Sequence, residues 1–302
     1  MAEALPPTPK AELLIDAALA NTLLESQHPD LLGLSIEIVE SGWDNAMIRL
    51  GSDLALRLPR RSAADPLVLS EQLWLPVLAP RLTLPVPTPL RIGTPTAVYP
   101  FHWSVLHWLP GEASDVSPPD SSEASRFAQF LRSLHDMKVD SYPPKNPVRD
   151  CPLTDKKLDT EKRLEFLGSK TDWITPQIMA TWNAALAARI DLPTSWIHGD
   201  LHSRNVLVFN HKLSAIIDWG DMCGGDPATD LAAIWSLFED EGARNCVLNA
   251  YGVSASTKAR AMGWAVFFGA ILGATGLKDS PRHAQISKTI LERVHRDYTP
   301  QS

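Results

Sequence analysis

The 302-residue chain is 44% apolar and 21% charged, and its formal net charge at pH 7 is −7. This composition excludes an intrinsically disordered protein, and the negative balance argues against partners such as nucleic acid or an anionic membrane surface. The length is greater than that of most single domains, so we expect two lobes. The three cysteines, Cys151, Cys223 and Cys246, are too widely spaced for a disulfide framework or a zinc site.

Neither the N-terminus nor the most apolar stretch predicts contact with a membrane. The first residues lack a basic region followed by an apolar core, so we expect no export signal and a cytoplasmic location. The most apolar stretch, residues 261–274, is shorter than the roughly 20 residues that a membrane-spanning helix needs. We interpret it as a buried core helix.

The first third of the chain is predicted to be rich in strands. Thr8 and Pro9 suit the start of a helix over about residues 9–25. Short apolar alternations over residues 35–58 predict three antiparallel strands. A helix is expected to begin at Asp65 and to be ended or kinked by Pro76.

The strand-rich region is predicted to end in two further strands, at residues 96–101 and 104–108, followed by a connecting segment at 109–112. The rest of the chain is predicted to be mainly helical. The expected helices cover about residues 122–137, 173–190, 255–275 and 283–297, with a charged, proline-containing insertion at 140–170.

Residues 197–220 contain the polar side chains that indicate chemistry. Two apolar runs flank the turn Asn210-His211-Lys212, which predicts a hairpin. If the strands pair symmetrically about His211 and Lys212, Asn205 faces Asp218 across the hairpin. An amide oxygen and a carboxylate would then be close enough to share a hard cation such as Mg²⁺. Asp200, in the loop that enters the hairpin, is available to orient a hydroxyl group and accept its proton.

The spacing of His198, Asp200, Asn205 and the triplet beginning at Asp218 resembles the catalytic and metal-binding loops of protein kinases. Gly199, His202 and the later segment 225–232 make the pattern more similar to the aminoglycoside phosphotransferase family of antibiotic and small-metabolite kinases. This resemblance implies a protein-kinase-like, bilobal α+β fold. A small antiparallel sheet lobe would cover residues 1–108, and a larger, mainly helical lobe would cover residues 109–302.

The resemblance also implies roles for individual residues. Asp200 would be the catalytic base, while Asn205 and Asp218 would hold Mg²⁺. His198 and Asp230 would support the catalytic loop without touching the substrate, Asp230 through backbone hydrogen bonds.

On the nucleotide side, Arg57 occupies the position of the usual phosphate-binding lysine, and its expected partner is Glu71. Arg57 could instead be a surface residue at the end of a strand. The turn containing Gly42 and Asn45 falls where kinases cover the phosphates, although any hairpin may contain such residues. Purine contacts are expected from the backbone at 107–109, which includes His107 and Leu109.

The predicted activity is transfer of the γ-phosphate of ATP or GTP to a hydroxyl group of a small molecule, most readily an aminoglycoside-type antibiotic. Asp221, Glu239 and Asp240 are candidates for binding its ammonium groups, although a run of charges is usually a solvated surface. A macrolide or a metabolite similar to homoserine or choline stays open as acceptor. The aromatic residues available for a macrolide pocket, which could equally form core, are Trp235, Phe238, Trp264, Phe267 and Phe268.

Two other functions compete with this prediction. A catalytically silent nucleotide-binding protein would explain Arg57 and the short phosphate turn. A metal-dependent phosphoesterase could use the histidines and aspartates of the catalytic loop, but it would need a second metal-ligand cluster that the sequence lacks. We expect a monomer or a weak dimer.

Overall fold

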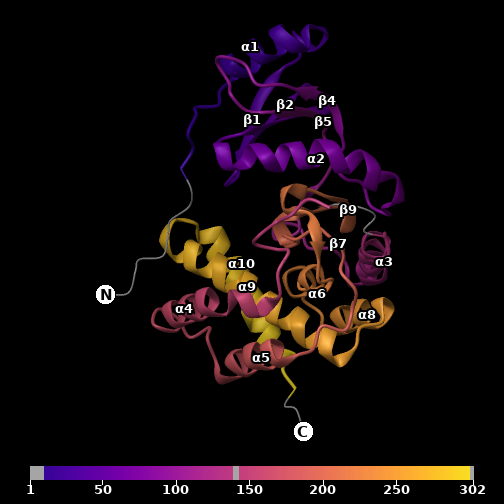
Figure 1. The fold of residues 1–302 in the computed structure, drawn as a ribbon, viewed down its shortest axis with the longest axis vertical. Coiled ribbons are helices and arrows are strands. Elements are labelled where there is room, and N and C mark those ends of the chain that lie inside the picture. Colours follow the sequence, from indigo (N-terminus) through magenta and orange to yellow (C-terminus); the bar gives the residue numbers. More distant parts are fainter. Residues whose placement is uncertain (1–9, 139–142, 300–302) are drawn as a thin grey trace. The chain divides into compact units, whose positions relative to one another are not determined.

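The computed structural model describes residues 10–138 and 143–299, which form two compact units (Figure 1). The N-terminal unit contains residues 10–110 and, in addition, the later segment Ala215–Gly220. The C-terminal unit contains the described residues of 111–214 and 221–299. Each unit has its own sheet or sheets and its own helices, and each is described separately below.

The N-terminal unit is built on a five-stranded antiparallel sheet with the strand order β1-β2-β3-β5-β4. The strands are β1 Ile36–Ser41, β2 Asn45–Leu50, β3 Leu54–Pro59, β4 Pro89–Gly93 and β5 Trp103–His107. The three strands predicted over residues 35–58 are therefore present. Tight connections at 42–44 and 51–53 join them, as the glycines and polar residues of the sequence indicate.

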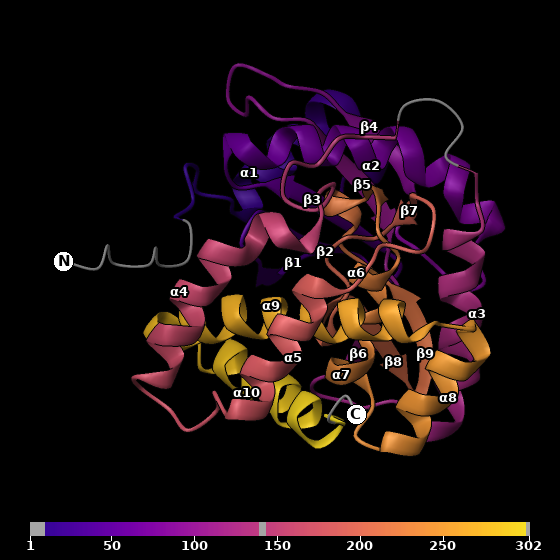
Figure 2. The same cartoon turned by 60° about the horizontal axis from the view of Figure 1, so that its bottom comes forward.

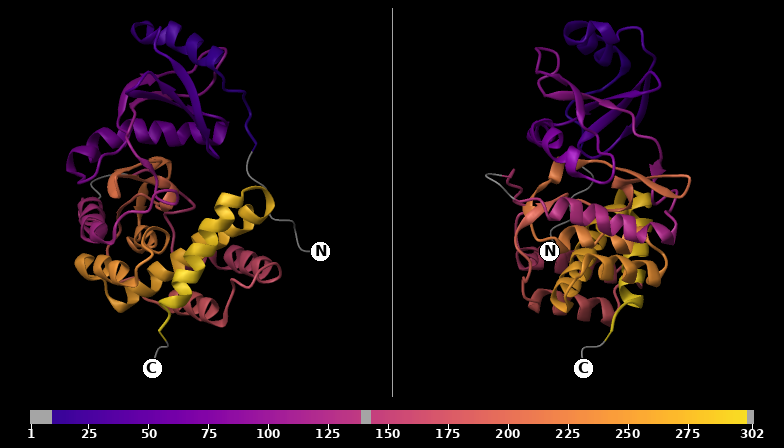
Figure 3. Two further views of the ribbon diagram at one scale, coloured as in Figure 1. Left: turned by 180° about the vertical axis from the view of Figure 1, so that it is seen from behind. Right: turned by 90° about the vertical axis from the view of Figure 1, so that its right-hand side faces the viewer.

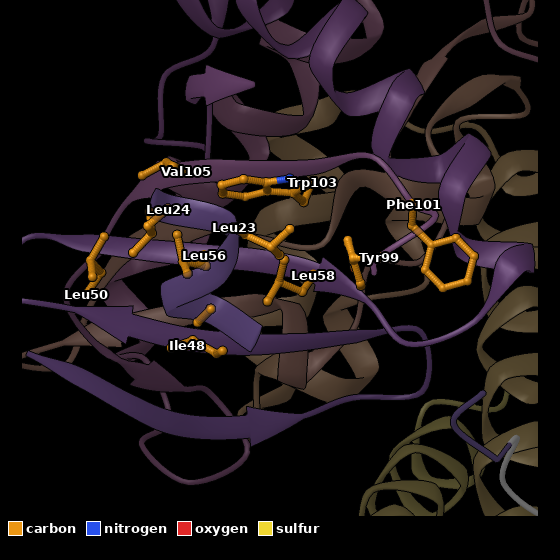
Figure 4. Packing of buried hydrophobic residues seen from close by; sticks show 11 residues of the cluster. Leu23, Leu24, Ile48, Leu50, Leu56, Leu58, Tyr99, Phe101, Trp103 and Val105 are labelled. Carbon is orange, nitrogen blue, oxygen red and sulfur yellow. The ribbon is translucent and has the colours of Figure 1, made fainter. Parts of the chain in front are cut away.

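Helix α1, Ala17–Gln27, packs on one face of this sheet. Its Leu23 and Leu24 lie among Ile48, Leu56 and Trp103 of three strands (Figure 4). Side chains alternate between the two faces of a strand, so Arg57, next to Leu56, is on the opposite face. That face contacts helix α2, Asp65–Leu78, whose residues interact with β3 and β5.

Two predictions for this unit are wrong in part. The first helix begins at Ala17, because the Asp16 side chain accepts a hydrogen bond from the Leu19 amide and caps the helix there; Thr8 and Pro9 lie outside the described residues. Helix α2 begins at Asp65 as predicted and continues two residues beyond Pro76, so of the two predicted effects of this proline the end of the helix is wrong, and a kink stays a prediction.

The strand predicted at residues 96–101 is a turn. The Thr96 amide donates to the Tyr99 carbonyl, and the Tyr99 amide donates to the Thr96 hydroxyl. The strand that pairs with β5 comes earlier, at Pro89–Gly93. Tyr99 still reaches the core, where its hydroxyl donates to the Pro59 carbonyl. Its burial explains the apolar pattern that suggested a strand.

The C-terminal unit is mainly helical, and two small sheets carry its functional loops. The longer helices are α3 Ala124–His135, α4 Lys157–Gly168, α5 Pro176–Ala187, α8 Glu241–Tyr251, α9 Ala255–Asp279 and α10 Pro281–Arg296. The short helices α6, Ala228–Leu231, and α7, Ile234–Leu237, follow the motif-bearing segment 197–220. The predictions of helices at 122–137, 173–190, 255–275 and 283–297 are confirmed, with somewhat different ends.

One sheet has the order β6-β8-β9, with β6 Glu112–Ala113, β8 Val206–Phe209 and β9 Lys212–Ile216 (Figure 2). Its residues belong to the C-terminal unit, except the last two of β9, which begin the later segment of the N-terminal unit. The other pairs β7, Ser195–Ile197, with β10, Cys223–Gly225. Short 3-10 turns complete the chain at Pro29–Leu31, Ser62–Ala64, Ala79–Arg81, Ser121–Glu123, Leu153–Lys156, Ser203–Asn205 and Trp219–Asp221.

The β8–β9 hairpin is present, but its turn lies one residue earlier than predicted. Asn210 and His211 form the turn, both with positive φ, as a tight two-residue hairpin connection requires. Asn205 lies in a 3-10 turn before β8, and Asp218 follows β9, so neither is a strand residue. The pairing of Asn205 opposite Asp218 in a strand ladder is therefore wrong.

Helix α9 is long and apolar enough to cross a membrane by length and composition, yet 83% of its most apolar window is buried inside the protein. It packs alongside α10, which runs beside it in the views of Figure 3, and it also contacts α4 and α5. This arrangement agrees with its interpretation as a core helix.

Candidate active site

The loop that carries Asp200 follows strand β7 and is fixed by a buried carboxylate. Asp230 accepts hydrogen bonds from the His198 amide at 2.7 Å and the Gly199 amide at 2.9 Å. The His135 ring nitrogen Nε2 lies 3.1 Å from the same carboxylate. Although burial alone would raise the pKa of Asp230, these partners lower it below its usual value. The catalytic loop is thus held by an ionised side chain from the start of α6.

Gly199 allows a close backbone approach within this loop. Its φ is +84°, and a Cβ atom there would lie 2.5 Å from the Asp221 carbonyl oxygen and 3.2 Å from Cγ of Arg149. A side chain at this position would therefore be strained by its conformation and would also collide with the backbone. Glycine before Asp200 is a geometric requirement of the loop.

The carboxylate of Asp200 has three neighbouring side chains in the C-terminal unit. Arg149 Nη2 donates to Oδ1 at 2.7 Å. Asn205 Nδ2 donates to the Asp200 backbone carbonyl at 2.8 Å and lies 3.4 Å from Oδ2. His202 Nε2 lies 3.5 Å from Oδ2. The two carboxylate oxygens are therefore held differently, with Oδ1 bound firmly and Oδ2 only at long distances.

Asp200 is ionised at neutral pH. Burial would raise its pKa, but the Arg149 guanidinium and His202 outweigh that effect and hold the pKa well below its usual range. An ionised carboxylate can orient a hydroxyl group and accept its proton. The geometry and charge of Asp200 therefore suit a general base.

Arg149 is a neighbour of Asp200 that the sequence did not reveal. It comes from the segment between α3 and α4, within the predicted insertion, and no motif surrounds it. Its Nη2 atom also lies 3.3 Å from Oδ2 of Asp221, and its guanidinium carbon lies 5.0 Å above the Phe268 ring. The only signal in the sequence was an arginine within the charged insertion, which did not indicate a partner.

The predicted phosphate-binding pair lies in the N-terminal unit. Arg57 Nε is 2.8 Å from Glu71 Oε2, and both side chains are buried. Arg57 Nη2 donates to Oδ1 of Asp218 at 2.6 Å. Arg57 is thus not a surface residue, and one guanidinium is shared by two carboxylates.

Sharing one cation affects the ionisation of the pair. Burial raises the pKa of Glu71 to about 7, because Arg57 only partly offsets the loss of water and Asp218 adds a second negative charge. The pKa of Arg57 is raised above its usual value, since both carboxylates outweigh its burial. Arg57 therefore stays charged.

The other residues predicted to contact nucleotide are all in the N-terminal unit. Gly42 lies in the connection between β1 and β2, where its amide donates to the Asn45 carbonyl at 2.8 Å. Asn45 begins β2 and is buried. His107 ends β5 with an exposed side chain, and Leu109 follows it. The turn is closed by its own hydrogen bond, consistent with a short phosphate cover.

Asn205 and Asp218 have donor atoms that fit a magnesium ion, each within its own unit. Asn205 donates through Nδ2 to the Asp200 carbonyl, so its side-chain amide oxygen is the atom that could bind a metal ion. Asp218 binds Arg57 through Oδ1, and its side chain is 47% exposed. Among the residues that the structure describes, no group of three or more His, Cys, Asp or Glu could hold a metal ion. Mg²⁺ commonly needs only one or two carboxylates together with phosphate oxygens.

The carboxylates predicted to bind ammonium groups are already engaged. Asp221 accepts from Asn146 at 2.6 Å, in addition to its contact with Arg149. Glu239 binds Arg293 and Arg296 at 2.8 and 2.9 Å. Asp240 caps α8 through the Ala243 amide. Of these three carboxylates, only Asp221 shares a hydrogen-bond partner with Asp200, namely Arg149.

The aromatic residues considered for a macrolide pocket are core residues. Each of the five is at most 4% exposed, and they are Trp235, Phe238, Trp264, Phe267 and Phe268. Glu239 lines a cavity of about 460 Å³ together with residues of α10 and of the segment before α5, and Asp200 is not part of that lining. The acceptor residues are therefore not identified by these predictions.

Comparison with known proteins decides the family. The family model described as the phosphotransferase enzyme family matches residues 35–264, which is most of the chain. The chain belongs to the phosphotransferase enzyme family. This match spans both units and includes Arg57, Asp200, Asn205 and Asp218. The family suggested by the sequence motifs is confirmed.

One relative of this phosphotransferase is a viomycin phosphotransferase from Streptomyces vinaceus. The two are 28% identical over 194 residues, which cover 60% of this chain and 66% of that relative. The aligned part of this chain thus spans just under two thirds of the length of the viomycin phosphotransferase.

Solved structures with the same fold include antibiotic phosphotransferases. The GDP and kanamycin complex of APH(2")-IIIa has a TM-score of 0.70 at 18% identity, covering 93% of this chain and 99% of the other. Macrolide 2'-phosphotransferase MphH from Brachybacterium faecium has a TM-score of 0.59 at 20% identity, with coverage of 94% and 99%. The predicted kinase-like α+β fold is confirmed.

Proposed function

We propose that this phosphotransferase transfers the γ-phosphoryl group of ATP or GTP to a hydroxyl group of a small-molecule antibiotic in a Mg²⁺-dependent reaction. The observation that carries the proposal is the state of Asp200. It is ionised, its loop is braced by Asp230, and its Oδ2 is held only at long distances. A carboxylate in this state supports the role of a base towards a hydroxyl group.

The proposed reaction breaks one bond and forms one bond at phosphorus. The acceptor O–H gives its proton to Oδ2 of Asp200, and the acceptor oxygen bonds to the γ-phosphorus. The bond between this phosphorus and the β–γ bridging oxygen breaks, and its electron pair leaves with the nucleoside diphosphate. Asp200 later releases the proton to water.

The remaining residues act by charge and position. We propose that Arg57, held by Glu71, binds phosphate oxygens of the nucleotide. Asn205 and Asp218 would hold Mg²⁺, which supplies neutralisation of the charge that develops on the phosphate oxygens. Gly42, Asn45, His107 and Leu109 remain the predicted contacts to the rest of the nucleotide.

An aminoglycoside-type acceptor is the first candidate, because aminoglycoside phosphotransferases share the fold. Viomycin and macrolides are the next candidates, since the named relatives act on them. Other hydroxylated metabolites stay in the comparison. The engaged carboxylates give no preference for a polycation. A cytoplasmic location and a monomeric or weakly dimeric state remain predictions.

The proposal is tested by nucleoside-diphosphate release with Mg²⁺ and either ATP or GTP. The acceptors are kanamycin, gentamicin, streptomycin, viomycin, a macrolide, homoserine and choline, and the Asp200→Asn variant is the control. Release that depends on one acceptor class and is lost in the control supports the proposal and names the acceptor.

Two outcomes would favour the competing functions. Tight nucleotide binding without release on any acceptor would favour a silent nucleotide-binding protein. Hydrolysis of a phosphate ester without nucleotide would favour a phosphoesterase. The lack of a three-ligand metal cluster among the described residues does not support the second of these.

A further inference from the structure

Arg149 lies 51 residues before Asp200 in the sequence, yet it makes the shortest side-chain contact of the catalytic carboxylate. The arginine side chain is only 9% exposed. A buried guanidinium is always charged and must be balanced by nearby acceptors. Among the described residues, its hydrogen-bond acceptors are the carboxylates of Asp200 and Asp221, both reached by Nη2.

The guanidinium of Arg149 is itself held in place. Asn146 Oδ1 accepts from the Arg149 backbone amide, while Asn146 Nδ2 donates to Asp221 at 2.6 Å. The Phe268 ring supports the guanidinium from one face at 5.0 Å. The Nε and Nη1 atoms have no hydrogen-bond acceptor among the described residues. The guanidinium of Arg149 is therefore held in an orientation in which it binds the two aspartates.

The backbone of the catalytic loop is shaped around the same contact. A Cβ atom on Gly199 would lie 3.2 Å from Cγ of Arg149 and 2.5 Å from the Asp221 carbonyl oxygen. The loop therefore needs glycine at the position where Arg149 and Asp221 pass it. Three segments distant in the sequence, at 146–149, 199–200 and 221, form one packed cluster.

Arg149 makes the two oxygens of Asp200 unequal. Oδ1 accepts the 2.7 Å hydrogen bond from Arg149, whereas the contacts of Oδ2 with Asn205 and His202 are 3.4 and 3.5 Å. We propose that Arg149 is a positioning residue for phosphoryl transfer, which anchors Oδ1 of Asp200 so that Oδ2 is the oxygen that accepts the acceptor's proton. This inference rests on the proposed function of Asp200 as the base.

The experiment compares turnover in Arg149→Gln, Arg149→Lys and wild type, with kanamycin as the first acceptor and then with the other acceptors named above. Arg149→Gln removes the charge that anchors Oδ1, so kcat is expected to fall by up to about 10²-fold, as a base displaced by about 1 Å predicts. The KM for nucleotide should change by less than about twofold, because only the base is displaced. Arg149→Lys should recover part of kcat, since an ammonium group keeps the charge but not the fork.

A double-mutant cycle separates positioning from a general loss of structure. Arg149→Gln in the Asp200→Asn background should lower the residual kcat by less than about twofold, because the residue through which Arg149 acts is already altered. The matched control is Arg260→Gln. Arg260 is another buried arginine that bridges two aspartates, Asp226 and Asp191, and its loss should lower the melting temperature without this pattern in kcat.

The proposal is overturned if Arg149→Gln turns over like wild type, or if its effect multiplies with that of Asp200→Asn. If Arg149→Gln does not fold, Arg149→Lys alone and combined with Asp200→Asn gives the same cycle. Failure of the proposed function has a different signature, because wild type would then release no nucleoside diphosphate with any acceptor.

Discussion

Glu71 and Arg57 form a buried ion pair, with 2.8 Å between Oε2 of the glutamate and Nε of the arginine. Arg57 replaces the lysine that the kinase pattern places at this position, and it uses a second nitrogen to bind Asp218. The planar guanidinium can serve two carboxylates at once, which a single ammonium group does less well. Within the N-terminal unit, the arginine at this position therefore has two carboxylate partners, Glu71 and Asp218.

Replacement of Arg57 should separate charge from shape. Arg57→Lys keeps a cation and should retain at least about a tenth of the wild-type kcat/KM for nucleotide, whereas Arg57→Met should lose about 10²-fold, the range of charged hydrogen bonds. Arg91→Met, on the exposed strand β4 of the same unit, is the control. Equal losses in the Lys and Met variants would contradict the importance of the charge.

Asp200→Asn should lower kcat by roughly 10²–10⁴-fold, the usual contribution of a general base. The variant keeps the size of the side chain and leaves the N-terminal unit unchanged, so nucleotide affinity measured by calorimetry should stay close to wild type. Wild-type turnover in this variant would remove Asp200 from the mechanism.

Asp218→Ala should weaken nucleotide binding only where Mg²⁺ contributes to it. We expect the nucleotide affinity in excess Mg²⁺ to fall by about tenfold or more, and the affinity without Mg²⁺ to change little, because a carboxylate ligand of the cation is lost. Asp53→Ala, at the exposed turn between β2 and β3, is the control. An unchanged affinity in excess Mg²⁺ would argue against the metal role.

Gly199→Ala should be more destabilising than an ordinary glycine substitution. At Gly252, which ends α8 with a φ of +82°, an added Cβ meets nothing within 4 Å, so Gly252→Ala should cost only the conformational term of about 1–2 kcal/mol. Gly199→Ala adds a collision with the Asp221 carbonyl and should lose more unfolding free energy. Similar losses in denaturant titrations of both variants would show that the loop adapts.

His283 should make stability depend on pH. Burial and the nearby Arg204 guanidinium lower its pKa to about 4, and Arg204 Nη1 lies 2.6 Å from its Nε2. The unfolded chain takes up this proton near pH 6.5, so the stabilisation is present above that pH and is lost as the pH falls towards 4. The unfolding free energy of wild type should fall by about 1–3 kcal/mol more than that of His283→Gln over this range. Parallel curves for the two proteins would contradict the assignment.

The sequence predicted features whose signals are local. Residues 35–58 contain short apolar alternations broken by turn residues, and helix α3 has apolar residues at helical spacing, so both patterns could be recognised from the sequence. Asp200, Asn205 and Asp218 were found because they belong to an ordered motif, and Arg57 was found from its place in a predicted strand.

The failures concern contacts between distant segments. Arg149 reaches Asp200 from an insertion without periodicity or motif, so nothing near it in the sequence indicated the contact. Glu239 looked free in a run of acids, but the arginines that bind it lie in α10, more than 50 residues later. The strand predicted at 96–101 failed for a local reason: the side chain of Tyr99 is buried as in a strand, but the backbone forms a turn there.

The segment Ala215–Gly220 belongs to the N-terminal unit, although the residues on both sides of it belong to the C-terminal unit. It contributes Asp218, the partner of Arg57. A gene fragment that ends at residue 110 would therefore encode an N-terminal unit without one of its own charged residues. A single crossover between two genes therefore cannot transfer every residue of the N-terminal unit, because its later segment is encoded more than 100 residues downstream of residue 110.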